Sequence, residues 1–158
     1  MYKRALIPVD GSVNAEAILP FILEIAGPLD IDVVLLQVVP PVVPLAVEGI
    51  PYVDPATIEA RREEAVAYLA GLAAEVRGKG LDVTRIVRIG EPMTEILAAA
   101  REAGADLIAM TTHGRTGAAR LLFGSIAEGV LRHADIPVFL MRQTEPDVAR
   151  RRREEVTR

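Results

Sequence analysis

Short runs of apolar residues alternate along the chain with longer stretches in which apolar residues recur every three or four positions. Nearly unbroken apolar runs are typical of strands that are covered on both faces of a parallel sheet. They predict four strands, at residues 5–9, 33–39, 107–110 and 136–141. A fifth run, residues 81–89, is interrupted by Thr84, Arg85 and Arg88, so it is expected to form a strand at the edge of the sheet.

The stretches between these strands have helical periodicity and recognisable ends. Ser12 is a candidate N-cap for a first helix, and Pro20 inside that helix should produce a kink or a boundary. Asp54 followed by Pro55 is a typical start for a long helix. A Ser-x-x-Glu capping box at Ser125 is expected to open the last helix. The four helices are therefore expected at residues 12–26, 54–77 and 92–103, and from residue 125 onward.

Strands and helices alternate in the order βαβαβαβαβ, and strands joined through helices run parallel. Right-handed crossovers place helices on both faces, so we expect a doubly wound, five-stranded, Rossmann-like α/β fold with four helices. The 158 residues show no break in composition, which indicates a single domain over residues 1–142. Two stretches fall outside this pattern. Residues 40–55 are an apolar loop with five prolines, and within it residues 42–53 are expected to be a lid or a partner contact. Residues 143–158 are a polar, Arg-rich tail.

The composition narrows the possible chemistry. The chain has no cysteine, which excludes disulfides, cysteine–zinc sites and a thiol nucleophile, and it has only two histidines, His113 and His133. Eighteen basic and twenty-two acidic residues give a net charge of −4, the opposite of the usual balance in nucleic-acid-binding domains. The longest uncharged stretch, residues 33–47, is too short to cross a bilayer. We therefore expect a cytoplasmic protein that binds neither nucleic acid nor membranes.

The candidate chemistry lies at the carboxyl ends of two strands. In an open parallel sheet, ligands bind beyond these ends, at the point where the strand order reverses. The first strand ends in Pro8, Val9 and Asp10, and the fourth continues into a glycine-rich segment, residues 110–125. Glycines let backbone N–H groups approach an anion closely, and Gly124-Ser125 leads into a helix N-terminus, which favours phosphate. If both segments build one pocket, the strand order is 3-2-1-4-5.

The sequence Pro-Val-Asp-Gly-Ser after the first strand, together with MTTHGRTGAARLLFGSIAEGVLRHADIPVFLMR, strongly resembles the universal stress protein family over about residues 1–142. The nucleotide-binding branch of that family carries the motif G-x2-G-x9-G-[ST]. Gly114 and Gly124-Ser125 fit this motif, and Thr111 stands in place of its first glycine. The β-carbon and hydroxyl of Thr111 would either crowd a ribose or replace a backbone contact with a hydroxyl contact.

The resemblance also implies where each part of a nucleotide lies. It places an adenine near Asp10 and Val38, a ribose near Met110 and Thr111, and phosphates around Gly114, Gly124 and Ser125. The only lysines are Lys3 and Lys79, so no P-loop lysine is present. Phosphates would therefore be held by N–H groups and hydroxyls, and by Arg115 or Arg120, in a loop that also contains Gly117.

The expected function is a regulatory protein that binds an adenine nucleotide, ATP with Mg²⁺ in the first instance, and acts through conformation and assembly. Two alternatives stay open: a dimeric interaction module that binds no nucleotide and, less favoured, a slow nucleotide hydrolase. In the simpler interpretation Asp10 is only a turn residue, the loop glycines only form turns, and Ser125 only caps a helix. The last strand, from Ile136 to Met141, is an apolar edge without lysine. This edge and the resemblance both imply a homodimer through that strand.

Overall fold

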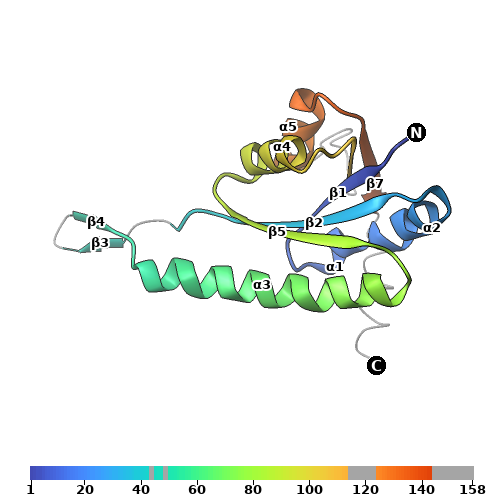
Figure 1. Cartoon of the computed structure of the whole chain (residues 1–158). Coiled ribbons are helices and arrows are strands. Elements are labelled where there is room, and N and C mark those ends of the chain that lie inside the picture. Colours follow the sequence, from blue (N-terminus) through green and yellow to red (C-terminus); the bar gives the residue numbers. More distant parts are fainter. Residues whose placement is uncertain (43–44, 48–49, 114–123, 144–158) are drawn as a thin grey trace.

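The computed structural model describes residues 1–42, 45–47, 50–113 and 124–143, with only the backbone described at 45–47, 50–52, 113 and 143. A five-stranded parallel sheet lies at its centre (Figure 1). The strands follow one another in the order β5 (Val83–Ile89), β2 (Asp32–Val39), β1 (Arg4–Val9), β6 (Leu107–His113) and β7 (Val138–Gln143). Along the chain these are the third, second, first, fourth and fifth strands of the sheet, so the predicted order 3-2-1-4-5 is confirmed.

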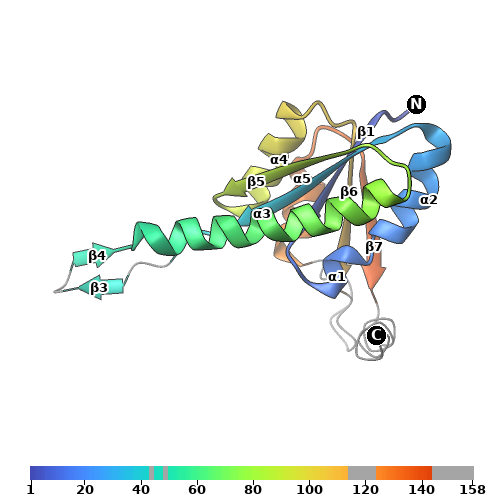
Figure 2. The same cartoon turned by 60° about the horizontal axis from the view of Figure 1, so that its bottom comes forward.

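Different helices cover the two faces of the sheet, as a doubly wound fold requires. Figures 1 and 2 show α1 (Val13–Glu16), α2 (Leu19–Leu29) and α3 (Pro55–Gly78) on one face, and α4 (Pro92–Glu102) and α5 (Ser125–His133) on the other. Side chains alternate along a strand, so successive residues of β1 belong to two hydrophobic cores, one on each face of the sheet. Ile7 packs with Leu69 of α3, whereas Leu6 packs with Ile96 of α4. The sheet is therefore buried on both sides.

Cap residues and prolines set several helix ends where the sequence indicates. Ser12 Oγ accepts a hydrogen bond from the N–H of Ala15 (3.1 Å), and Asp54 Oδ1 accepts one from the N–H of Ala56 (3.0 Å). Pro20 lies in the first turn of α2, where a missing N–H costs little. The helix expected over residues 12–26 is therefore divided into α1 and α2.

The start of α5 differs from the expected capping box. Gly124 is the N-cap residue and no side chain caps it, while Ser125 is already the first helical residue. Glu128 pairs with Arg132 one turn further on (2.7 Å). A capping box needs the serine at the N-cap position, so the shift of one residue leaves the first N–H groups of α5 without a side-chain acceptor among the described residues.

The segment expected to be a loop, residues 40–55, contains a short antiparallel hairpin of β3 (Leu45–Val47) and β4 (Ile50–Tyr52). Strands of three residues among several prolines give too little alternation to be recognised in the sequence. The hairpin lies beyond the N-terminal end of α3, away from the sheet (Figures 1 and 2). It therefore does not cover the carboxyl ends of the strands as a lid would. The buried side chains of α3 begin only at Ala65.

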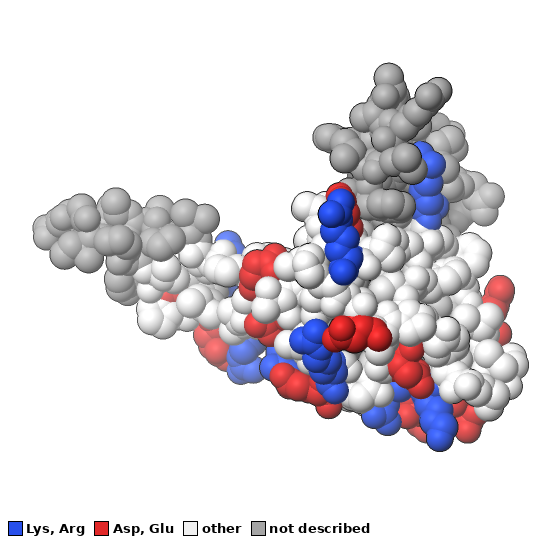
Figure 3. Space-filling model, turned by 90° about the horizontal axis from the view of Figure 1, so that it is seen from above, with Lys and Arg blue, Asp and Glu red and all other residues white. Residues whose placement is uncertain are grey.

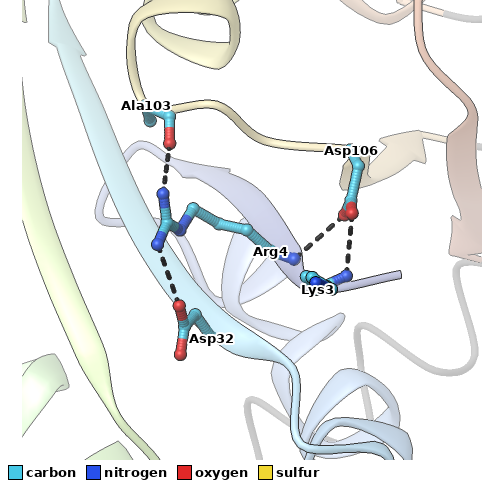
Figure 4. A network of polar contacts seen from close by, with 5 residues as sticks. All are labelled: Lys3, Arg4, Asp32, Ala103 and Asp106. Carbon is cyan, nitrogen blue, oxygen red and sulfur yellow. Dashed lines mark hydrogen bonds and ion pairs between the residues drawn. The ribbon is translucent and has the colours of Figure 1, made fainter. Parts of the chain in front are cut away.

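Polar contacts join the elements at the amino ends of the strands (Figure 4). The carboxylate of Asp106, just before β6, accepts hydrogen bonds from the N–H groups of Lys3 (2.8 Å) and Arg4 (2.9 Å). The guanidinium of Arg4 donates to the carbonyl of Ala103 after α4 (2.7 Å) and to the carboxylate of Asp32 in β2 (3.0 Å). This edge of the sheet is thus held by side chains that bridge β1, β2, α4 and β6.

Acidic and basic side chains are interspersed on the face that carries α4 and α5 (Figure 3). Ion pairs join Arg101 to Asp135 (2.8 Å) and Arg132 to Glu128 (2.7 Å), with all four side chains exposed or half-buried. Over the described residues this face shows no continuous patch of one sign. Among the described helices, none combines the length and the apolar character that a membrane span requires.

Candidate functional site

The central strands separate at their carboxyl ends. β1 pairs with β6 only as far as Leu6 and Ile108, whereas its pairing with β2 continues to Val9 and Gln37. β6 in turn stays paired with β7 to its last residue. A cavity of about 780 Å³ lies at this opening, within the usual size range of ligand pockets. Its walls come from the ends of β1, β2 and β6 and from α1, α3, α4 and α5.

The end of β1 supplies Pro8, Val9 and Asp10 to the cavity wall. Asp10 is exposed, and its Oδ1 accepts a hydrogen bond from the N–H of Ser12 (2.9 Å), which forms the turn into α1. Gly11 in this turn has a φ of +80°, in the left-handed region that favours glycine. Asp10 therefore takes part in a turn, and the same turn sets its carboxylate at the wall of the cavity.

β2 and α3 build the opposite wall. Val38 lines the cavity, and the structure adds Gln37 and Tyr68, which the sequence analysis missed. The hydroxyl of Tyr68 donates a hydrogen bond to Glu16 Oε1 (2.6 Å) and so joins α3 to α1. Burial and this contact raise the pKa of Tyr68 far above its usual value, so its hydroxyl keeps its proton.

Tyr68 could have been recognised from its spacing. Arg61, Glu64 and Tyr68 follow one another at three and four residues, which puts them on one face of α3, and all three line the cavity. Gln37 carries a weaker signal, because it is the one polar residue between Val33 and Val39.

The end of β6 supplies Met110, Thr111 and Thr112. Met110 is buried in the core shared with α4 and α5, while Thr111 is half-buried at the wall. The side chain of Thr112 is only 4% exposed, and its Oγ1 has no hydrogen-bond partner among the described residues. Gln37 Oε1 is also a buried atom that has no hydrogen-bond partner among the described residues. Two buried polar atoms without partners at one cavity indicate a place that a polar ligand completes.

The start of α5 forms the last part of the wall with Gly124 and Ser125. Both residues are exposed, and a Cβ added at Gly124 would meet nothing within 4 Å. The uncapped N–H groups of this turn, together with the helix dipole, favour an anion. The other predicted phosphate contacts, Gly114, Arg115 and Gly117, lie outside the described residues, as does Arg120.

Among the described residues, the charged side chains at the cavity are Asp10 and Glu64, which are acidic, and Arg61, which has no ion pair there. No group of three or more metal-ligating side chains occurs in the described part of the chain. His133 lies at the other end of α5, with Nδ1 2.8 Å from the carbonyl of Gly129. Its position suits a helix C-terminus rather than the cavity.

The fold and the cavity together define a doubly wound α/β protein with a ligand pocket at its topological switch point. Residues 1–142 match the model of the universal stress protein family. The chain is also 33% identical over 150 residues to a universal stress protein of Methanocaldococcus jannaschii, which covers 93% of this chain and 86% of that relative. The chain therefore belongs to the universal stress protein family, which confirms the resemblance found in the sequence.

Solved structures of the family have the same fold. A universal stress protein from Burkholderia pseudomallei is 29% identical and aligns with a TM-score of 0.70 over 89% of this chain and 96% of that one. The universal stress protein from Archaeoglobus fulgidus, solved in complex with dAMP, is 25% identical and aligns with a TM-score of 0.60 over 88% of this chain and 97% of that one.

Proposed function

We propose that the protein binds an adenine nucleotide, ATP with Mg²⁺, in the cavity between β1 and β6, and that it acts through conformation and assembly rather than through rapid turnover. The observation that carries the proposal is the opening of the sheet beside an uncapped helix N-terminus. The β1–β6 ladder ends at Leu6 and Ile108, and α5 begins at the same cavity with Gly124 as its N-cap. This combination suits a ligand that has an anionic end and a larger body.

The relative from Archaeoglobus fulgidus supports the class of ligand, because that protein was solved with an adenine nucleotide, dAMP. The resemblance to the nucleotide-binding motif supports the same class through Gly124 and Ser125, which lie at the cavity. Neither argument distinguishes ATP from a monophosphate. The choice of ATP rests on the family's motif and is decided by experiment.

The residues at the cavity fit Mg²⁺ only as part of a nucleotide complex. The described chain has no cluster of three ligands, and Mg²⁺ is usually bound by one or two carboxylates together with substrate phosphates. Asp10 and Glu64 are the carboxylates on the cavity wall, and Asp10 keeps Oδ2 free of the turn in which its Oδ1 takes part. When bound, Mg²⁺ would neutralise phosphate charge in a chain whose own net charge is −4.

Replacement of Gly124 tests the site directly. Gly124→Val should abolish ATP binding in titration calorimetry, because the branched side chain fills the open space at the first N–H groups of α5. The φ of −55° at Gly124 suits any residue, so the variant should fold. Gly71→Val is the matched control, since a Cβ there also meets nothing and Gly71 lies in α3 away from the cavity wall. Equal binding by wild type and Gly124→Val would contradict the assignment.

The interaction module without a nucleotide is the second candidate, and Thr111 at the cavity wall is the observation that favours it. Mass spectrometry of nucleotide released from freshly purified, heat-denatured protein distinguishes the two. If the wild type binds no nucleotide, Thr111→Gly identifies the cause by restoring binding. If that variant also binds none, the chain belongs with the interaction modules.

We also propose a homodimer through β7. Six of the ten exposed large apolar side chains of the described residues lie on β7 or on its neighbours, α5, which contacts it, and α2, which lies beside it in Figures 1 and 2. These are Phe139 in β7, Phe21, Ile25 and Leu29 in α2, and Ile126 and Leu131 in α5. An apolar edge strand flanked by apolar helices fits antiparallel pairing with a second copy about a two-fold axis.

Phe139→Asp tests the dimer. A charge buried at a self-complementary contact acts on both chains, so light scattering should find a dimer for the wild type and a monomer for the variant. Val66→Asp is the control, because Val66 is equally exposed but lies in α3. A wild-type protein that stays monomeric at tens of micromolar would contradict the proposal.

A further inference from the structure

We propose that Tyr68 is a positioning residue for the ligand: through Glu16, its hydroxyl holds in place the chain segment that presents Asp10 to the cavity. The inference rests on the nucleotide binding proposed above and concerns how the free protein keeps that site in shape. Tyr68 and Asp10 line the same cavity, although one lies in α3 and the other at the end of β1.

The turn from β1 into α1 decides where the carboxylate of Asp10 points. Asp10 and Gly11 are both exposed, and the φ of +80° at Gly11 belongs to the region that favours glycine. Oδ1 of Asp10 accepts from the N–H of Ser12 (2.9 Å), which leaves Oδ2 for a ligand. The direction of Oδ2 therefore depends on where Ser12, and with it α1, is held.

Residues 10–16, here called the rim segment, include this turn and α1, and they are weakly anchored by burial. Val9 before the segment and Ala17 after it are buried, but no residue within it is. Ser12 caps α1 from inside the segment, so the cap does not attach it to another element. Ala15 packs against the core under α2 and α3, but an alanine buries little apolar surface. Side-chain contacts with neighbouring elements therefore matter for the position of the rim segment.

Tyr68 provides such a contact. α1 and α3 lie on the same face of the sheet (Figures 1 and 2), and the hydroxyl of Tyr68 donates a 2.6 Å hydrogen bond to Glu16 at the end of α1. Burial raises the pKa of Tyr68 most, and Glu16 and the charge of Asp10 raise it further. The N–H of Gly11 acts on the same hydroxyl and lowers the pKa. The hydroxyl therefore lies beside both ends of the rim segment.

The rest of the Tyr68 side chain gives this contact a firm base. It packs against the core under α2 and α3, and neighbouring residues of α3, Ala65 and Leu69, are buried in that core. A side chain held in this way can fix a mobile neighbour because its own position is set by packing. The hydrogen bond therefore connects an exposed segment to the interior of the protein.

Order in the rim segment before binding favours the ligand. A segment that is already in its binding arrangement does not have to be ordered when the ligand arrives, so binding costs less free energy. When only a fraction of the molecules has the segment in place, the apparent affinity falls by that fraction. Loss of the Tyr68 hydroxyl should therefore weaken the ligand through Asp10, without removing any contact between Tyr68 and the ligand.

The test is a double-mutant cycle between Tyr68 and Asp10, measured by titration calorimetry of the full-length protein with ATP and Mg²⁺. Tyr68→Phe should weaken ATP binding about fivefold, the value of one net hydrogen bond. Asp10→Ala should weaken binding by itself. In the Asp10→Ala background, Tyr68→Phe should change the affinity by less than about twofold, because the carboxylate that it positions is absent.

Matched variants separate positioning from a general loss of stability. Tyr2→Phe removes the hydroxyl of an exposed tyrosine outside the cavity wall and should leave ATP binding unchanged. Glu16→Gln keeps an acceptor for Tyr68 and should retain most of the affinity, whereas Glu16→Ala should match Tyr68→Phe. Circular dichroism verifies the fold, and Glu16→Ala takes the place of Tyr68→Phe in the cycle if the latter does not fold.

Three results overturn the inference while nucleotide binding stands. The first is equal ATP affinity in the wild type and Tyr68→Phe, which would leave the hydroxyl with a purely structural role. The second is a loss on Tyr68→Phe that is as large in the Asp10→Ala background as in the wild type. The third is an Asp10→Ala variant that binds ATP as the wild type does. If the wild type binds no ATP, the proposed function fails, and this inference fails with it.

Discussion

The two edges of the same sheet are built on different principles. At the amino edge, Asp106 accepts from two backbone N–H groups and Arg4 donates to two further elements, so the polar atoms named there have partners (Figure 4). At the carboxyl edge, β1 and β6 separate, a helix begins without a side-chain cap, and two buried side-chain oxygens have no partner among the described residues. The polar groups of the amino edge are paired within the chain, whereas the carboxyl edge leaves polar groups unpaired among the described residues.

The difference separates residues that maintain the fold from residues that are available for binding. A hydrogen-bonded polar group at the amino edge stabilises the chain whether or not a ligand is present. An unpaired buried group at the carboxyl edge destabilises the free protein, and under the proposed function it gains a partner when the nucleotide binds. Removal of a paired group at the amino edge and removal of an unpaired group at the carboxyl edge should therefore change the stability in opposite directions.

The largest expected effect is that of the nucleotide itself. At a concentration one hundred times its Kd, ATP should raise the free energy of unfolding by about 2.7 kcal/mol, which thermal unfolding detects as a higher Tm. Hydrogen exchange should slow in the turn around Gly11 and in the first turn of α5, and should not change at the N–H groups of Lys3 and Arg4. Slower exchange at the amino edge alone would mean that ATP binds there and not at the carboxyl edge.

Tyr68→Phe measures how much the hydrogen bond between α3 and α1 at the carboxyl edge contributes to the stability of the unliganded protein. The hydroxyl of Tyr68 donates to the carboxylate of Glu16, and hydrogen bonds to charged groups are worth more than neutral ones. We expect the free energy of unfolding to fall by about 2 kcal/mol in urea titrations. Glu16→Gln keeps an acceptor and should lose less. If Tyr68→Phe leaves the stability unchanged, the contact between α3 and α1 does not stabilise this edge.

Asp106→Ala tests the amino edge. Its removal leaves the N–H groups of Lys3 and Arg4 without their acceptor, which should cost about 1–2 kcal/mol because the Lys3 contact is exposed and the Arg4 contact only partly buried. ATP affinity should not change, since Asp106 lies at the opposite end of the strands from the cavity. A loss of nucleotide binding as large as the loss of stability would show that the edges are coupled.

The same carboxylate predicts a pH dependence. Burial opposes ionisation of Asp106, but the N–H groups of Arg4 and Lys3 outweigh it and hold the pKa of Asp106 below its usual value. A lowered pKa in the folded state means that the contribution is present above the unfolded pKa, about 3.9, and is lost as the pH falls through the folded value. Asp106→Asn should therefore lose less stability than the wild type below about pH 4, measured by urea titration.

The sequence predicted the fold more fully than the site, and the two edges show why. Strand order followed from apolar runs and from the requirement that Asp10 and the glycine-rich segment share one pocket, and the pairing of β1 with β6 confirms it. Pro20 and Asp54 were recognised because proline and capping residues act locally. The capping box at Ser125 was wrong by one residue, because the pattern alone does not fix where a helix begins.

Spacing along α3 points to Tyr68, but the contacts that the missed residues make or lack are contained in no local pattern. Tyr68 and Glu16 are fifty-two positions apart and meet only because α1 and α3 lie on the same face of the sheet. Gln37 and Thr112 stand out because a buried oxygen of each has no hydrogen-bond partner among the described residues, which only the packed structure reveals. The amino-edge network joins residues up to 103 positions apart and has no sequence signature either.

The smallest expected effect has the opposite sign from the other substitutions and is the sharpest test of the comparison. Thr112→Val replaces a buried hydroxyl that has no partner among the described residues with a methyl group of similar shape. Because an unsatisfied buried polar group costs free energy, the unliganded variant should be more stable than the wild type by about 1 kcal/mol. The urea midpoint should rise with an unchanged m-value, and the stabilisation by ATP should shrink. Thr84→Val, at an exposed position of β5, is the control and should change stability by no more than about 0.5 kcal/mol. A Thr112→Val protein that is less stable than the wild type would show that the hydroxyl is satisfied without a ligand, and the distinction between the two edges would not hold at β6.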